Sequence, residues 1–408
     1  MGERIWTPKG EALWKTIQGG ENRLCLGMNS CDFYRDGRTV SDLWDFLGAD
    51  RHPMLRGLML SSGIDETYIG GKASAYDKAY ALAEVLPRWA GNPYYAAIHD
   101  LLEKIFFCSV PLNTETLPDI WQKVAYQLAA EDMSISAVVK AYGFTRVLYP
   151  ASGMPQVPLG GEPCLFHNIT PVISPYHPAF ADMLMEMSSL SAQTAVSAIE
   201  EIAHGEMQDA AAQGGVYYVT DVSAMTDFPR PHPYPAGQVC QKLSCKEEVS
   251  DSERDLLLAQ MLRYVADNMS AHEGTLVLEG IRPAVYERML VYLKDQKIGH
   301  LPLCVTQCPE DAVSLIRLGA KVALTLELTS TELQIEDAIN RVAAGAPIGC
   351  LAGLCLSAKG IVDLPLIYRI EKLFCGCIAA WGERGLGPAD QGSMSAVAEG
   401  VLRPVLRR

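Results

Sequence analysis

Short apolar runs alternate with longer amphipathic stretches along most of this 408-residue chain. Each run has the length of a buried strand, and the stretches between runs carry apolar residues at helical spacing. The eight runs are Leu24–Met28, Arg146–Tyr149, Cys164–Ile169, Val216–Thr220, Thr275–Leu278, Leu303–Thr306, Lys321–Leu326 and Cys350–Leu356. Strand–helix alternation predicts a parallel sheet, and eight units predict an α/β fold of the closed (β/α)8 TIM barrel type.

A long helical stretch separates the first two predicted strands. Apolar residues recur at helical spacing from Val40 to about Tyr142, interrupted by breakers such as Asn92-Pro93. A block of this size is an insertion and not a barrel repeat. We therefore predict three parts: residues 1–38 with the first strand, a helical insertion over residues 39–143, and the rest of the barrel over residues 144–408.

A Pro-rich segment follows the fourth predicted strand. Asp227–Gly237 reads DFPRPHPYPAG, which predicts a loop because proline holds the chain extended. The loop is long enough to cover the barrel mouth, and a plain surface connection explains the pattern equally well.

The charge balance excludes several classes of partner. The formal net charge is −14, and no Lys/Arg run is longer than the terminal pair Arg407-Arg408, which argues against nucleic acid and anionic membranes. No apolar run reaches the ~18 residues that span a bilayer. Met1–Ile5 does not open a signal peptide. We expect a cytoplasmic protein.

Twelve cysteines raise the question of a disulfide scaffold. Most of them, including Cys25, Cys164 and Cys304, lie inside apolar runs, which favours buried reduced thiols in a cytosolic protein. Cys375 and Cys377 are two apart on a predicted helix and therefore face different ways. The spacing matches neither a zinc knuckle nor a CxxC redox pair.

The stretch Asp50–Phe107 contains sequence motifs that are unusual for a helical insertion. It contains GIDETYIGGKAS at Gly63–Ser74 and GNPYY at Gly91–Tyr95, and the helix after the last strand carries YRIEKLFCGCIAAWGERG at Tyr368–Gly385. In these segments the chain resembles the uronate (glucuronate) isomerases, a family of amidohydrolase-like barrels. The resemblance covers most of the chain, densely from Asp50 to about Trp121 and thinly through the middle of the barrel.

The resemblance implies an aldose–ketose isomerisation of a hexuronate of the glucuronate or galacturonate type. It also implies a divalent metal, held by a His-x-His pair on strand one and an Asp after strand eight. This sequence departs from that pattern, because Asn29 and Cys31 stand at the His-x-His positions and Ser357 stands at the Asp position. An amide, a thiol and a hydroxyl are poor replacements for imidazole and carboxylate ligands. We therefore predict no metal site and no cofactor.

Seven residues remain as candidates for the site. The resemblance places His52 and Arg56 on a His and an Arg of the family, and Lys359 on an Arg that follows strand eight. The resemblance implies a catalytic role for His52, and because chemistry in a barrel belongs at the carboxyl ends of the strands, we predict catalytic roles for Asp221 and Glu279 as well. Substrate-binding roles are predicted for four: Arg56, His167, Arg282 and Lys359.

Three of these candidates also have a structural alternative. Asp221 has the position of a helix cap, His167 that of a core histidine, and Lys359 that of an exposed lysine. Two carboxylates in one barrel mouth, such as Asp221 and Glu279, would shift each other's pKa as a proton shuttle requires. Lys359 would pair with a substrate carboxylate as a point charge, which an acidic protein needs in order to bind a sugar acid.

Three functional hypotheses follow. The first is altered isomerase chemistry on a hexuronate without a metal, using His52, Asp221, Glu279 and Lys359. The second is a non-catalytic pseudoenzyme that binds a sugar acid or a partner subunit. The third is a different reaction on the same scaffold, with His167 or Cys31 at the site. Because large barrels are usually homo-oligomers, we expect one here.

Overall fold

The computed structural model describes most of the chain. The described residues are 7–18, 24–25, 40–130, 135–144, 146–150, 164–187, 189–212, 215–269, 271, 274–356 and 358–402. Asn29, Cys31 and Ser357 lie outside them. The expectations that concern these three residues therefore stay expectations.

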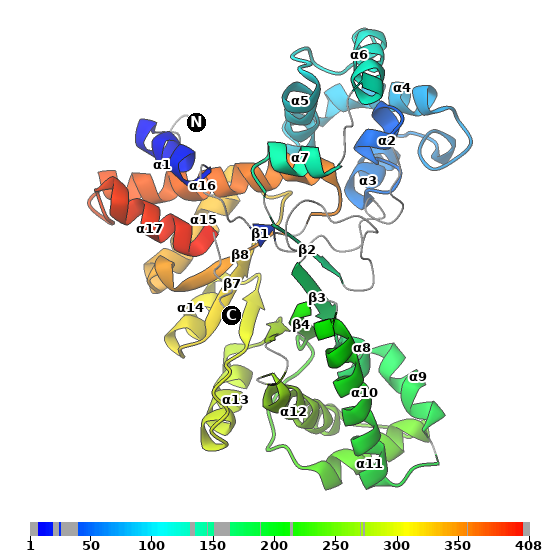
Figure 1. The fold of residues 1–408 in the computed structure, drawn as a ribbon, viewed down its shortest axis with the longest axis vertical. Helices are drawn as coiled ribbons and strands as arrows, with labels where there is room; N and C mark the ends of the chain where they lie inside the picture. The colour runs from blue at the N-terminus through cyan, green and yellow to red at the C-terminus, as the bar shows by residue number, and fades with distance from the viewer. Residues whose placement is uncertain are drawn as a thin grey trace.

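Eight parallel strands form one sheet in chain order (Figure 1). They are β1 Leu24–Cys25, β2 Arg146–Pro150, β3 Cys164–Asn168, β4 Gly215–Asp221, β5 Thr275–Glu279, β6 Leu303–Thr306, β7 Lys321–Thr325 and β8 Leu351–Cys355. Every predicted strand overlaps one of them. Within the described part of the chain, the hydrogen-bonded ladder runs from β1 to β8 without a β8–β1 pair. The predicted α/β fold of the (β/α)8 barrel type is confirmed.

The inner face of this sheet has its own small core. Tyr217, Val277, Leu303, Val305 and Ala323 are buried together, and Val219, Ala352 and Cys355 pack against them. We call these eight residues the lumen core. Side chains alternate between the two faces of a strand. On β4, Asp221 therefore lies on the same inner face as Tyr217 and Val219, and on β5, Glu279 lies on the same inner face as Val277. The lumen core therefore predicts which strand-end side chains reach the barrel mouth.

A block of helices occupies the chain between β1 and β2, as the sequence predicts (Figure 1). Its α-helices are α2 Leu43–Leu47, α3 Pro53–Ser61, α4 Ala75–Val85, α5 Pro93–Phe106, α6 Leu117–Ala130 and α7 Ile135–Ala141. Several begin as their sequences require: Asn92 accepts from the N–H of Tyr94, and Pro93 fills the first position of α5. We call α2–α7 the helical block.

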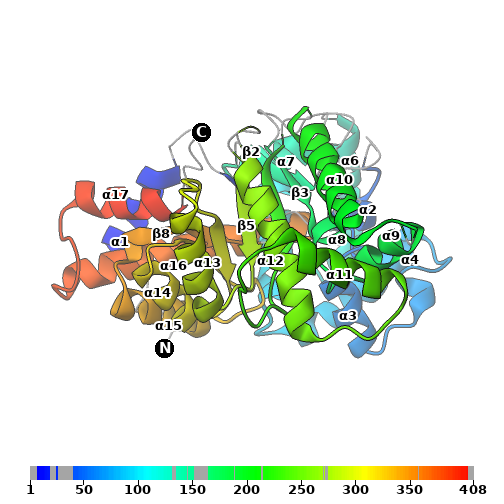
Figure 2. The same ribbon diagram turned by 90° about the horizontal axis from the view of Figure 1, so that it is seen from below.

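The remaining helices follow the strands. They are α8 Thr170–Ile173, α9 Pro178–Glu186, α10 Ala192–Ala212, α11 Pro233–Ser244, α12 Asp251–Asn268, α13 Pro283–Asp295, α14 Pro309–Arg317, α15 Glu332–Gly345, α16 Leu364–Glu383 and α17 Gln391–Leu402. The N-terminal α1, Pro8–Gln18, packs along α16 and α17 on the side of the molecule opposite α9 and α11 (Figure 1, Figure 2).

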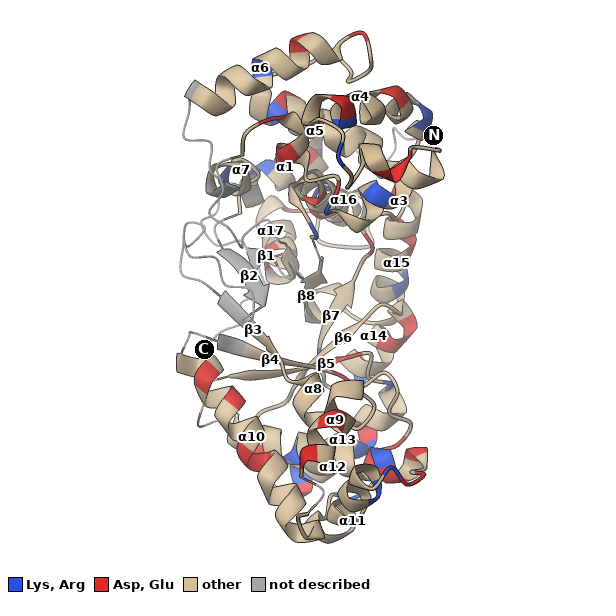
Figure 3. Ribbon diagram, turned by 90° about the vertical axis from the view of Figure 1, so that its right-hand side faces the viewer, with Lys and Arg blue, Asp and Glu red and all other residues tan. Residues whose placement is uncertain are grey.

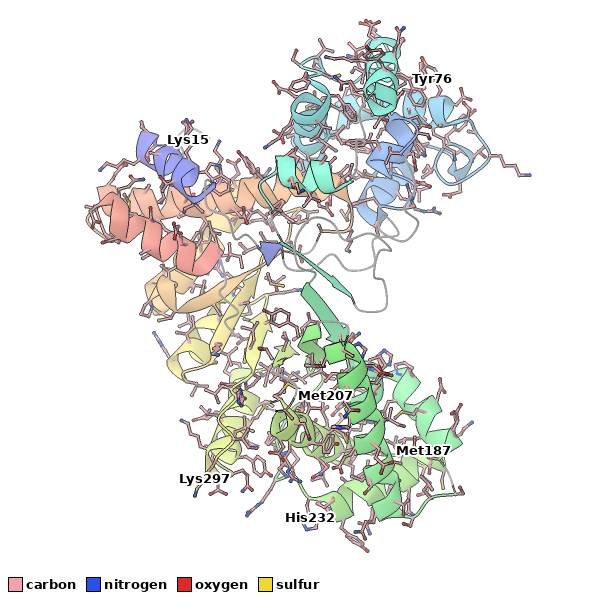
Figure 4. The ribbon with its side chains drawn as sticks, viewed as in Figure 1. Lys15, Tyr76, Met187, Met207, His232 and Lys297 are labelled. Carbon is pink, nitrogen blue, oxygen red and sulfur yellow. The ribbon has the colours of Figure 1, made fainter. Side chains whose placement is uncertain are left out.

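The Pro-rich segment after β4 is not wholly a loop. Residues from Pro233 onward form the first turns of α11, which packs on α9, α10 and α12. The prediction of a loop through Gly237 was therefore wrong, because His232 caps the helix and Pro233 fits its first turn. His232 lies at the far end of the molecule from Tyr76 in the helical block (Figure 4).

Surface charge is dispersed over the described helices. In the view of Figure 3, acidic and basic residues are interspersed on both the helical block and the barrel helices. None of the described helices combines the length and the apolar composition that crossing a bilayer requires.

Candidate functional site

Asp221 and Glu279 are neighbours at the carboxyl ends of β4 and β5. The two residues are paired in the parallel register, and the N–H of Val222 donates to the carbonyl oxygen of Glu279 at 2.9 Å. Adjacent strands lie roughly 5 Å apart, and both side chains continue rows of the lumen core. The structure therefore brings together two of the three predicted catalytic residues.

The backbone after these strands is shaped to keep the two ends close. Gly280 has a φ of +73°, and a Cβ on it would lie 2.7 Å from the Cβ of Ser223. Only glycine tolerates both the left-handed conformation and this approach. The carboxylate of Asp221 accepts the N–H of Ser223 at 2.8 Å, so that its loop is fixed as well.

The surroundings of Glu279 favour its protonated form. Its side chain is open to solvent at the barrel mouth but has protein on most sides. This partial removal from bulk water and, second, the charge of Asp221 raise the pKa of Glu279. Burial and, second, the charge of Glu279 raise the pKa of the Cys355 thiol in the lumen core to about 11.

His52 is buried away from solvent, with 2% of its surface exposed. It precedes α3, where its Nδ1 accepts the N–H of Leu55 at 3.3 Å, and its Nε2 lies 3.0 Å from Oδ2 of Asp363. Asp363, 1% exposed, also accepts the hydroxyl of Tyr94 at 2.8 Å and the N–H of Lys359 at 2.5 Å. The structure places His52 inside a buried network and not at the barrel mouth.

Sequence reasoning missed Asp363 and Tyr94. The available signals were an acidic residue directly before Leu364-Pro365, at the start of a helix, and a tyrosine in the first turn of α5. Burial of Tyr94, followed by the charge of Asp363, raises the pKa of the phenol well above its usual range, so that it is a hydrogen-bond donor throughout the ordinary pH range.

The predicted binding residues are dispersed. Lys359 follows β8 with an exposed side chain, and Arg282 is exposed just before α13. Arg56 pairs with Glu66 at 2.9 Å on the surface of the helical block. His167 pairs with Glu206 of α10 at 2.9 Å, on the helix-facing side of the sheet. Lys359 lies in the turn between β8 and α16, and its binding role stays a prediction.

His167 faces α10 because of strand parity. It pairs in register with Tyr218, which is fully buried and donates its hydroxyl to the carbonyl of Met207 on α10. Figure 4 labels Met207 on that helix. The two side chains share the outer face of the sheet, opposite the lumen core.

The described residues do not fit a divalent-metal centre. Throughout the described ranges, no three His, Cys, Asp or Glu side chains cluster as ligands would. Glu279 has the carboxylate of Asp221 beside it, and two carboxylates are fewer than the three ligands that such a centre needs.

Comparisons with known proteins agree on one family. Residues 32–148 match the family model for glucuronate isomerase. The uronate isomerase of Oceanobacillus iheyensis is 38% identical over 81 residues, 20% of this chain and 17% of that protein. That of Thermotoga maritima is 38% identical over 93 residues, 23% and 20% of the two chains. The sequence matches span about a fifth of the length of these relatives.

Two solved structures are similar over nearly the whole length. A uronate isomerase from Thermotoga maritima superposes with a TM-score of 0.77 at 15% identity, covering 97% of this chain and 96% of that one. A glucuronate isomerase from Caulobacter crescentus gives a TM-score of 0.72 at 12% identity, covering 99% and 96%. At these identities the superpositions establish the fold.

Proposed function

Because this chain belongs to the uronate isomerase family, we propose that it isomerises a hexuronate of the glucuronate or galacturonate type between its aldose and ketose forms. The observation that supports the proposal is the Asp221–Glu279 pair, set side by side at the barrel mouth. Moving a proton between two adjacent carbons needs a base and a group that polarises the carbonyl oxygen. A carboxylate beside a carboxylic acid would supply both.

The proposed reaction uses the open-chain sugar. The carboxylate of Asp221 removes the proton from the carbon next to the aldehyde, while the protonated Glu279 donates its proton to the aldehyde oxygen, giving an enediol. Asp221 then returns its proton to the former aldehyde carbon, and Glu279 takes the proton of the second hydroxyl to leave the ketose. The raised pKa of Glu279 increases the protonated fraction that the first step needs.

Lys359 is the proposed partner of the substrate carboxylate. Its ammonium group is a flexible point charge after β8. An acidic protein needs such a local positive charge to hold an anionic sugar. His52 is given no direct contact with the substrate, because it is buried against Asp363.

A second candidate function is binding without catalysis, in the manner of a pseudoenzyme. The observation that favours it is the engagement of Arg56, His167 and His52 in pairs within the protein. These three side chains are committed to structure, whereas an isomerase would direct them to a substrate. The ligand would again be a sugar acid held through Lys359.

Ketose formation tests the two candidates. Purified protein is incubated with glucuronate or galacturonate, with and without added zinc or manganese, and the ketose is measured. The Glu279→Gln variant, purified identically, is the control for contaminating enzyme. We expect turnover that falls by about a hundredfold or more in Glu279→Gln, as for loss of a general acid. Thermal stabilisation by a uronate without any ketose would favour the binding protein, and no response to either sugar would contradict both.

A further inference from the structure

A buried carboxylate joins the helical block to the loop after β8. Asp363 ends the turn Ile361–Asp363 that leads into α16, and it accepts three hydrogen bonds. Two donors, His52 and Tyr94, belong to the helical block, more than two hundred residues away along the chain. The third is the backbone N–H of Lys359, at 2.5 Å.

The tautomer of His52 follows from its two contacts. Its Nδ1 accepts the N–H of Leu55, so the ring proton lies on Nε2 and is donated to Asp363. The histidine therefore both caps α3 and binds the carboxylate. Its orientation is further fixed by an edge-to-face contact with the ring of Tyr94, with ring centroids 5.4 Å apart.

Gly360, in the loop after β8, packs directly against the imidazole of His52. A Cβ on Gly360 would lie 2.9 Å from Cδ2 of His52, so this glycine allows the loop to touch the imidazole. The backbone at Lys359–Gly360 is thus held from one side by packing and from the other by the carboxylate of Asp363.

We propose that Asp363 is a positioning residue for Lys359, and that His52 and Tyr94 of the helical block hold Asp363 in place. The helical block, and not the barrel alone, thereby sets where the positive charge meets the substrate carboxylate. This inference rests on the proposed function for the role of Lys359. The clamp on the Lys359 backbone is independent of that role.

Two variants test the clamp. Tyr94→Phe removes a single hydroxyl, and Asp363→Asn replaces the shared acceptor. The matched control is Tyr142→Phe, because Tyr142 is also fully buried next to the helical block and donates its hydroxyl to a carboxylate, that of Asp100 at 2.8 Å. Tyr142 has no contact with the loop after β8 among the interactions that the described residues make.

Two measurements are made on each protein. The first is hydrogen–deuterium exchange at the amide of Lys359, resolved with overlapping peptides. The second is the dissociation constant for glucuronate and for glucose, which lacks the carboxylate. We expect exchange at Lys359 to accelerate about tenfold or more in Tyr94→Phe and Asp363→Asn, the effect of losing a hydrogen bond to a charged acceptor. Affinity for glucuronate should fall in the same variants while that for glucose stays unchanged.

The outcomes separate the inference from the proposed function. Exchange at Lys359 that changes no more in Tyr94→Phe than in Tyr142→Phe would overturn the positioning role. If exchange accelerates as expected but the unaltered protein binds glucuronate no better than glucose, the clamp stands and the carboxylate-binding role of Lys359 is wrong. If Asp363→Asn fails to fold, Tyr94→Phe alone decides, because it removes one donor and leaves the carboxylate paired with His52.

Discussion

Asp221 and Glu279 are register partners at the ends of β4 and β5, and the carbonyl oxygen of Glu279 accepts the N–H that directly follows Asp221. The ladder between the two strands thus extends one hydrogen bond beyond Asp221. This hydrogen bond joins the backbone beside Asp221 to the backbone of Glu279, so the two strand ends hold each other in place. Changes on either strand end should therefore be felt by the pair.

The first prediction concerns pH and Glu279→Gln. The folded protein raises the pKa of Glu279 above its ordinary value of 4.5, so ionising this residue costs more in the folded than in the unfolded state. Its stabilising contribution is complete below that ordinary value and is lost as pH rises through the folded-state pKa. Glutamine removes the cost, so the melting temperature of Glu279→Gln relative to the unaltered protein should rise by about 1–3 °C between pH 4 and pH 7.5. A difference that shrinks with rising pH would contradict the raised pKa of Glu279.

Gly280→Ala is expected to disturb the same pair through the backbone. The substitution forces an L-residue into a positive φ and sets its Cβ against Ser223. Left-handed strain alone costs roughly 1–2 kcal/mol, so we expect a loss of about 2 kcal/mol or more in urea denaturation, together with reduced turnover. Gly57→Ala, in α3 with no atom within 4 Å of the added Cβ, is the control and should be neutral or stabilising. Equal effects of the two substitutions would contradict the close approach.

The sequence predicted the barrel well because its signal is local. Each strand is a short apolar run between helical stretches, and all eight appear in order. The break between α9 and α10 and the start of α11 were not anticipated, since both depend on caps at single residues, Ser191 and His232. Such a cap is one hydrogen bond, and it changes the hydrophobic period very little.

His167→Gln should leave the function unchanged. The histidine lies on the outer face of β3, paired with a half-exposed Glu206. A pair of this kind contributes about 0–1 kcal/mol, so a small loss of stability is the expected effect. Uronate affinity and ketose formation, measured as for the unaltered protein, should not change. A large loss of affinity at full stability would place His167 at the site after all.

The candidate site was less predictable than the fold. Position at a strand end singled out Asp221 and Glu279, but it could not separate them from His167. A shift of one residue along a strand moves a side chain from the inner to the outer face of the sheet, and the apolar run alone does not fix that register. His52 was found through the family resemblance, yet its partner Asp363 is distant in sequence. Contacts between segments so far apart leave no periodic pattern in either one.

Asp255→Asn should destabilise the loop that follows β4. The fully buried carboxylate of Asp255 accepts the N–H and hydroxyl of Thr226, the N–H of Asp227 and the hydroxyl of Tyr176. The side-chain NH2 of asparagine is a donor, so it would face some of these N–H and O–H donors and could not accept their hydrogen bonds. Because hydrogen bonds to a charged group contribute about 1.5–3 kcal/mol each, we expect a loss of about 3 kcal/mol in denaturant unfolding. Tyr176→Phe, which removes one donor, should cost about 1 kcal/mol, and a larger effect than that of Asp255→Asn would contradict this arrangement.

Cysteine alkylation gives a direct probe of the barrel mouth. Burial, and then the charge of Glu279, raises the pKa of Cys355 to about 11, so only about a thousandth of it is thiolate at pH 8. The exposed Cys350 should therefore react with iodoacetamide much faster than Cys355 in the same molecule. Glu279→Gln removes the neighbouring negative charge, and the rate at Cys355 relative to Cys350 should rise severalfold when both are followed by mass spectrometry. An unchanged ratio would mean that Glu279 does not face Cys355 across the lumen, and the inward direction assigned to the carboxyl of Glu279 would then be wrong.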